Sequence, residues 1–122
     1  MSSSAYQVIG NTIRIDANAT PGTGNIAAFS SGFGGQSGPV FVKVENPNNS
    51  NVDIFFNAST ASNVSATIAT VGSPGTGVPV QHGSTAFIQV AAKNTPPTTI
   101  YFAAAAASGT GVYITPVILV GE

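Results

Sequence analysis

The sequence predicts an all-β protein, an antiparallel β-sandwich of jelly-roll or Ig-like type. Short segments alternate apolar and polar residues, and turn signals separate them, which predicts about eight or nine short strands at intervals of ~8–12 residues. No segment shows the apolar period of an amphipathic helix. The chain has 122 residues, which fits one domain. We expect residues 1–5 to form a short flexible arm and residues 6–122 to form one sandwich domain.

The clearest strand pair is predicted at residues 39–57, PVFVKVENPNNSNVDIFFN. Both arms alternate with a period of two, and the NPNNS segment between them favours a short hairpin loop. Centring that loop on Asn48 places Val44 opposite Val52 and Lys43 opposite Asp53. We therefore expect a hairpin here, with its charged tip in solvent.

Further strands are expected along the rest of the chain wherever the same alternation returns. Pro79 confines one of them to an edge or a bulge. The five alanines 103–107 favour helix intrinsically, but β-branched and aromatic residues precede them and the run is too short for an isolated helix. We predict a strand there, with small side chains that let another sheet or subunit approach closely. The expected strands are 6–9, 12–17, 64–71, 78–80, 85–91, 99–107 and 111–120, and residues 26–29 are compatible with a further short strand.

The glycine-rich segment 18–38 breaks regular structure and has two interpretations. In the first it is a crossover whose Phe29 and Phe33 close the end of the core, because aromatic side chains bury large areas. In the second it is an apolar-tipped loop that docks on a neighbouring subunit, because loops often carry function. Both interpretations stay open at this point.

Residues Val117–Val120 are apolar on both faces. This pattern predicts a strand that is covered on both sides, in part by a neighbouring molecule. Pro116 cannot donate to a β-ladder and so predicts a bulge or an edge. Together with the two phenylalanines of the glycine-rich segment, these residues form the predicted contact surface. Its members are Phe29, Phe33, Pro116, Val117, Ile118, Leu119 and Val120.

The composition is unusual for a free monomer. Only 6% of residues are charged, against about 25% in an average soluble domain. No stretch reaches the ~18 apolar residues of a membrane span, and three cations cannot supply a nucleic-acid surface. We therefore expect a surface that copies of the chain or another protein cover, with neither nucleic acid nor membrane as a partner. The start of the chain lacks the charged and apolar regions of a signal peptide.

Residues for catalysis or cofactor binding are sparse. The single histidine, His82, has Ser84 nearby, but the four acids stand on separate predicted elements, so no triad is expected. The oxygen-rich segment 45–53 lacks a calcium-loop pattern, and the glycines at 72–77 lack the lysine and helix of a phosphate loop. We predict no enzyme activity, no cofactor and no metal.

Three stretches give the chain a family resemblance: PVFVKVENPNNSNVDIFFN, STAFIQVAA and TTIYFAAAAASGTGVYITPVILVGE. With no cysteine and little charge, they make it resemble small virion proteins of tailed bacteriophages, above all capsid decoration (cement) proteins. The resemblance implies a β-sandwich or jelly-roll subunit, often a homotrimer. Such a subunit would be made in the host cytoplasm. It would then bind the major capsid protein lattice on the capsid exterior and stabilise the shell.

Two other functions are compatible with the sequence. A phage fibre or neck component, or a carbohydrate-binding adhesin module, would present aromatic side chains on a concave face, and Tyr6, Tyr101 and Tyr113 are the only tyrosines. An ice-binding surface of Thr and Ala is a third idea, but the chain has no regular Thr-x-Thr array.

Overall fold

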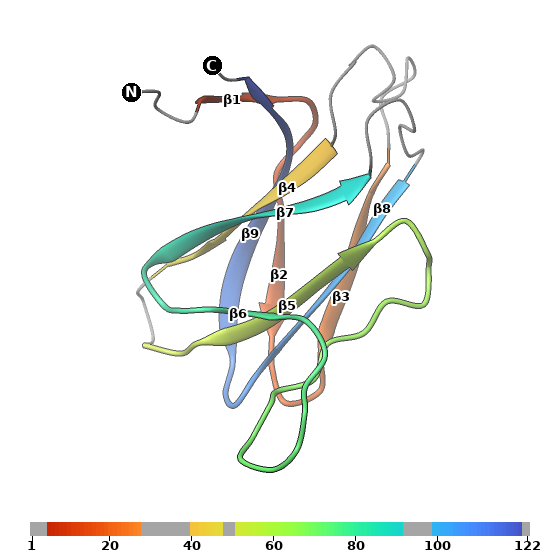
Figure 1. Cartoon of the computed structure of the whole chain (residues 1–122). Helices are drawn as coiled ribbons and strands as arrows, with labels where there is room; N and C mark the ends of the chain where they lie inside the picture. Colours follow the sequence, from red (N-terminus) through yellow and green to blue (C-terminus); the bar gives the residue numbers. More distant parts are fainter. Residues whose placement is uncertain (1–4, 28–39, 48–50, 92–98, 121–122) are drawn as a thin grey trace.

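The chain folds into a sandwich of two antiparallel sheets (Figure 1). The computed structural model describes residues 5–27, 40–47, 51–91 and 99–120, and all regular structure in these ranges is β. The predicted all-β class is therefore confirmed. The nine strands are β1 (Ala5–Val8), β2 (Ile13–Ala17), β3 (Gly22–Ala27), β4 (Val40–Asn46), β5 (Ile54–Ser59), β6 (Val78–Val80), β7 (Ser84–Ala91), β8 (Thr99–Ala106) and β9 (Thr110–Val120).

The strand pairings are nested along the chain. β1 and β2 pair with β9, β3 with β8, β4 with β7, and β5 with β6. Two further pairings, β4 with β9 and β5 with β8, join these layers into a five-stranded sheet (β1 and β2 beside β9, then β4, then β7) and a four-stranded sheet (β3-β8-β5-β6). A long antiparallel ribbon wound into two facing sheets in this order has jelly-roll topology.

The predicted hairpin at 39–57 is wrong. Both arms are strands, but β4 pairs with β7 and β9 while β5 pairs with β6 and β8. The two strands lie in opposite sheets, and the alternation only indicates that each has one buried face. The predicted Lys43–Asp53 pair is also wrong, because Lys43 lies 3.8 Å from Glu45 and Asp53 bonds His82.

One polar side chain holds this corner of the sandwich together. Asn46 ends β4 and is fully buried. Its Nδ2 donates to the carbonyls of Val52 and Val80, both at 3.0 Å, and its own carbonyl accepts from Gly83 N at 2.7 Å. Among the described residues, the side-chain oxygen Oδ1 has no hydrogen-bond partner. Asn46 therefore links the end of one sheet to the strands of the other.

The apolar core lies between the two sheets. Val42 and Val44 face it from one sheet, and Ile54 and Phe56 face it from the other, all of them fully buried. The rings of Phe56 and Phe102 stack with 6.2 Å between their centroids. The inward side chains of alternating strands thus make one continuous core, as in other β-sandwiches.

The strand in the glycine-rich segment begins earlier than predicted. β3 covers Gly22–Ala27, whereas the sequence was compatible with a short strand at 26–29. Gly24 is required there because a Cβ at this position would lie 2.7 Å from the ring of Phe102. The glycines that seemed to break the element let it pack closely on an aromatic core.

Segment 64–71 is not a full strand, contrary to the prediction. It forms a small ribbon with 73–76 through backbone bonds of 2.9–3.0 Å between Thr67 and Thr76 and between Thr70 and Ser73. Its Ala66, 2% exposed, packs on the outward-facing Ala103 and Ala105 of β8. The alanine run is a strand, as predicted, and its small side chains admit a segment of the same chain.

Pro116 lies where the neighbouring strand is interrupted. β1 pairs with β9 at Val117–Val120 and β2 pairs with it at Thr110–Ile114. Between them the carbonyl of Pro116 accepts a bond from Ile9 N at 3.0 Å. The N–H and C=O of one strand residue point to the same side, so an N–H at position 116 would point toward this gap between β1 and β2. Proline has no N–H, and no ladder hydrogen bond is lost there.

Candidate functional site

The outer face of the five-stranded sheet, called here face A, carries most of the exposed large apolar side chains. The registers put Tyr6 and Val8 of β1, Phe87 of β7 and Tyr113 of β9 on this face. Their exposed fractions are 40%, 53%, 38% and 40%. Several exposed aromatic and aliphatic side chains on one sheet face are typical of a binding surface.

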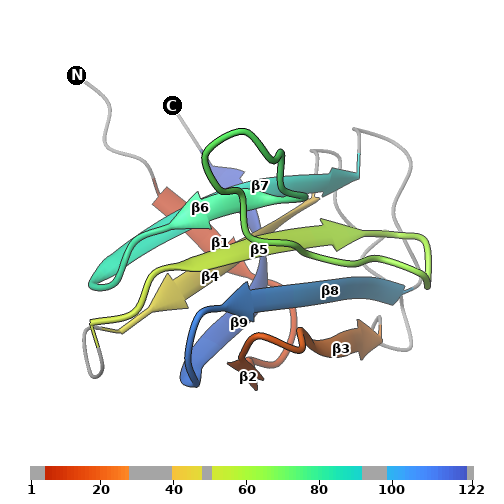
Figure 2. The same cartoon turned by 90° about the horizontal axis from the view of Figure 1, so that it is seen from below.

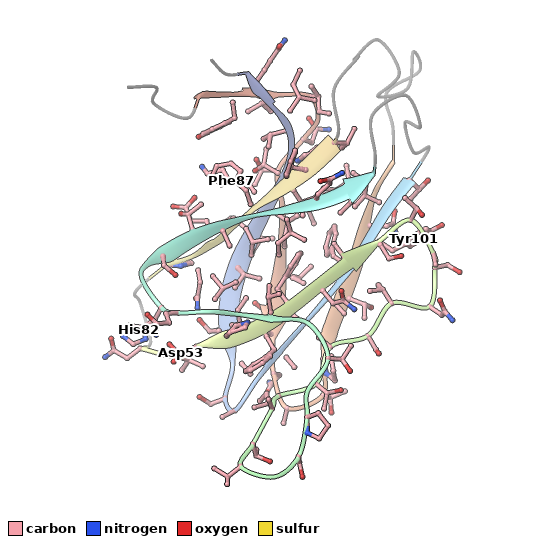
Figure 3. The ribbon with its side chains drawn as sticks, in the orientation of Figure 1. Asp53, His82, Phe87 and Tyr101 are labelled. Carbon is pink, nitrogen blue, oxygen red and sulfur yellow. The ribbon has the colours of Figure 1, made fainter. Side chains whose placement is uncertain are left out.

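Face A is shaped by an aromatic contact that spans the sheet. The rings of Tyr6 and Phe87 lie 5.4 Å apart, although β9 and β4 separate their strands. Val117 lies on the same face and is fully buried. The two rings therefore lean toward each other across the sheet and help to cover its middle (Phe87 is labelled in Figure 3).

A lysine completes this cluster. Lys43 Nζ lies 5.1 Å from the centroid of the Tyr6 ring and 3.8 Å from Glu45. Hydrogen bonding with the Tyr6 side chain, more than the nearby Glu45 carboxylate, raises the pKa of Lys43 above its usual value. The cluster therefore keeps a positive charge beside an exposed aromatic ring.

The described charges also gather on face A. Lys93 and Glu122 lie outside the described residues, and four of the other five charged residues share this face: Arg14, Asp16, Lys43 and Glu45. Arg14 Nη2 lies 3.2 Å from Asp16, and the Arg14 side chain lies over Gly111. Exposed pairs of this kind contribute only ~0–1 kcal/mol to stability. Their main effect is to place charged groups beside the exposed aromatic side chains of face A.

The predicted contact residues do not form an exposed surface in the described part of the chain. Phe29 and Phe33 fall outside the described residues. Pro116, Val117 and Ile118 are buried within the chain's own sheet, between β1 and β4. The backbones of Leu119 and Val120 pair with β1. The chain itself thus covers residues 116–118, and a partner contact at the seven residues stays a prediction.

A second polar arrangement joins Asp53 and His82, which lie on separate predicted elements. The carboxylate of Asp53 accepts bonds from His82 N at 3.0 Å and from His82 Nδ1 at 2.7 Å (Figure 3). The backbone N–H bond, and next the ring bond, lower the pKa of Asp53 below its usual value. Both side chains are exposed. The pair fastens the turn before β7 to the start of β5.

The nearby hydroxyl of Ser84 does not complete a triad with this pair. The Ser84 hydroxyl donates to the carbonyl of Gln81 at 2.6 Å and so completes the same turn. A nucleophile must instead bond the base that accepts its proton. In the described part of the chain no group of three or more His, Asp or Glu side chains could hold a metal ion.

Two surface hollows flank the four-stranded sheet. One, of about 370 Å³, is lined by Asn51, Asp53, Phe55 and Ser108 among others. The other, of about 250 Å³, lies between β3, β8 and the segment after β5, where Thr23, Asn25, Ser62 and Tyr101 bring polar groups together. Asn25 and Tyr101 are directly opposite in the β3–β8 ladder. This second hollow offers hydroxyl and amide groups beside an aromatic ring.

The fold and these surfaces define an antiparallel jelly-roll sandwich with an exposed aromatic sheet face. No protein-family model matches the chain, and searches of curated proteins and of solved structures gave no match. Across the described ranges, no helix is long and apolar enough to cross a membrane.

Proposed function

We propose that this chain is a structural virion protein that decorates and stabilises a phage capsid, binding the major capsid protein lattice as an oligomer. The observation that carries the proposal is face A, where Tyr6, Val8, Phe87 and Tyr113 are exposed together. The resemblance of the sequence to decoration proteins supplies the partner. Jelly-roll sandwiches occur in viral capsids and in lectins, so the fold supports the proposal only by analogy.

Binding to a lattice suits a face of this kind. Tyrosine and phenylalanine supply large contact areas, and the two ion pairs on the same face can set the orientation of a partner. Each contact can be weak, because an oligomer that engages several lattice points gains affinity by avidity. The protein is accordingly expected to act as a non-catalytic component of the particle exterior.

The test is binding to shells assembled from the major capsid protein of the same virus, without this chain. The wild-type protein should cosediment with these shells, and Tyr113→Ala should weaken the binding at least tenfold. Val71→Ser is the matched control, because Val71 is fully exposed at the tip of the 67–76 ribbon, away from face A. Equal binding by both variants, or no binding by the wild type, would refute the proposal.

A second candidate function is carbohydrate binding, by an adhesin module or by a fibre or neck component. The hollow beside Tyr101 favours it, because amide and hydroxyl groups beside an aromatic ring match the hydroxyls and apolar face of a sugar. A glycan array would decide: binding that Tyr101→Ala abolishes and Tyr113→Ala leaves intact supports this function. An array without any bound glycan rejects it.

A further inference from the structure

The edge of the five-stranded sheet formed by β7 differs from the other sheet edges in the described part of the chain. β7 pairs with β4 on one side, and no described strand pairs with its other side. It has eight residues, STAFIQVA, without a charge or a proline. Unprotected edges of this length present a row of backbone donors and acceptors that can pair with another strand.

The remaining edges combine short length, proline, charge or coverage, features that the sequence and length of β7 do not provide. β6 has only three residues and contains Pro79. β2 carries the charged residues Arg14 and Asp16. β3 also lies close to β2, so close that a Cβ on Gly22 would clash with the carbonyl of Asp16. β1 has only four residues. Short strands, proline, charge and coverage are the usual means by which proteins block edge pairing.

The side chains of β7 point to the same conclusion. Ala86, Ile88 and Val90 face the core but are only partly buried. The opposing edge strand β6 is much shorter, and Figure 2 shows β6 and β7 together along one side of the sandwich. On the other face Phe87 is 38% exposed. Apolar surface is therefore incompletely covered on both faces of this edge.

We propose that β7 is a strand-pairing interface that joins two copies of this chain into an antiparallel twofold dimer with one continuous ten-stranded sheet, five strands from each copy. A second copy is the occupant because β7 is compatible with itself. Twofold pairing places a strand opposite its own reversed sequence, so the residue at the axis faces its own copy, and a charge there would face a like charge. β7 has none.

The side chains select a register centred on Phe87. This register places Phe87 opposite its symmetry mate and Ala86 opposite Ile88, so apolar residues meet on both faces. The bulge between Val40 and Phe41, where Val90 is the extra residue of β7, ends the regular stretch. The dimer presents two copies of face A on one side. It supplies the oligomer that the proposed function requires, yet its test needs no capsid, so either proposal can fail alone.

The first test measures mass by sedimentation and light scattering. The wild type should have twice the chain mass of 12.1 kDa. Phe87→Glu should give the single-chain mass, because two carboxylates would meet on the twofold axis. This variant should still fold, because Lys43 lies opposite Phe87 within the chain. Val8→Glu, on the same face in β1, is the control and should remain dimeric. A wild-type monomer or trimer, or dissociation by Val8→Glu alone, overturns the proposal.

The second test uses the absence of native cysteine. Phe87→Cys should form a disulfide-linked dimer rapidly under mild oxidation, whereas Thr85→Cys, two residues from the axis, should crosslink at least tenfold more slowly. Equal rates at both positions would indicate random collision and refute the register. Circular dichroism of the reduced variants verifies that each is folded.

Discussion

Replacing Asn46 by alanine should be strongly destabilising, because this buried side chain links the two sheets. Asn46→Ala removes two hydrogen bonds to the carbonyls of Val52 and Val80. Each such bond contributes about 1 kcal/mol, and leaving a buried acceptor without its donor adds to the loss, so we expect about 2–3 kcal/mol in total. Removal of the unpartnered Oδ1 offsets a small part of this.

The measurement is equilibrium unfolding in urea. With a slope of about 2 kcal/mol per M, the midpoint should fall by about 1–1.5 M. Asn57→Ala is the matched control: Asn57 also donates to a backbone carbonyl, that of Ser65, but at an exposed site. Its loss should stay below about 1 kcal/mol. Equal losses for the two variants would refute the role assigned to Asn46.

Asn46→Asp separates shape from hydrogen bonding. The carboxyl group would be buried and would face two carbonyl oxygens, so its folded pKa should lie above the usual value of about 3.9. A raised folded pKa means that stability is retained below pH ~4 and is lost as pH rises, at up to about 1.4 kcal/mol per pH unit. The Asn46→Ala deficit should not depend on pH in this way.

Three further predictions concern single positions. Since His82 lowers the pKa of Asp53, the stabilisation by this pair is present above the ordinary value of 3.8 and is lost as pH falls through the lower folded value. In His82→Ala the backbone donor remains, so an NMR titration of Asp53 should show only a partial return toward 3.8, and a full return would contradict the assigned cause. Gly24→Ala should lower stability by about 1–3 kcal/mol through overpacking against Phe102, and an unchanged thermal midpoint would show that β3 can shift. Ala105→Leu should release the segment around Ala66 from the sheet, measured as faster amide exchange at 64–68, whereas Ala107→Leu, at an exposed site, should leave it protected.

The sequence predicted where strands occur better than it predicted their partners. The alternation in 40–45 and 52–57 marks one buried face on each strand, and both are strands in the structure. The same alternation occurs when two successive strands form a hairpin in one sheet and when they lie in two different sheets. It therefore could not show that β4 pairs with β9, about seventy residues away in the sequence. The apolar run at the end of the chain did indicate a strand covered on both sides, and Val117 and Ile118 are buried there.

The surfaces were harder to predict than the strands. Face A combines Tyr6, Phe87 and Tyr113 from strands far apart in the sequence, and their common face follows only from the registers. Asp53 and His82 are separated by 29 positions and meet because β5 pairs with β6. Gly24 looked like a breaker because glycine weakens strands intrinsically, and only the position of the Phe102 ring explains it.

The nested pairing gives the molecule two poles. Ala5 pairs with Val120, so both ends of the wound ribbon lie at one pole, and the ribbon reverses at the opposite pole near the exposed Val71 and Gly72 (Figure 1). Adjacent ends and an exposed turn are the conditions under which circular permutation succeeds. A permuted chain that starts at Gly72 and joins the old ends by a short linker would keep every ladder of both sheets. Permutation would change the sequence separation between paired strands, lengthening that of β5 and β6 and shortening that of β1 and β9. The folding rate of the permuted chain would therefore measure how strongly folding depends on the order of the strands in the sequence.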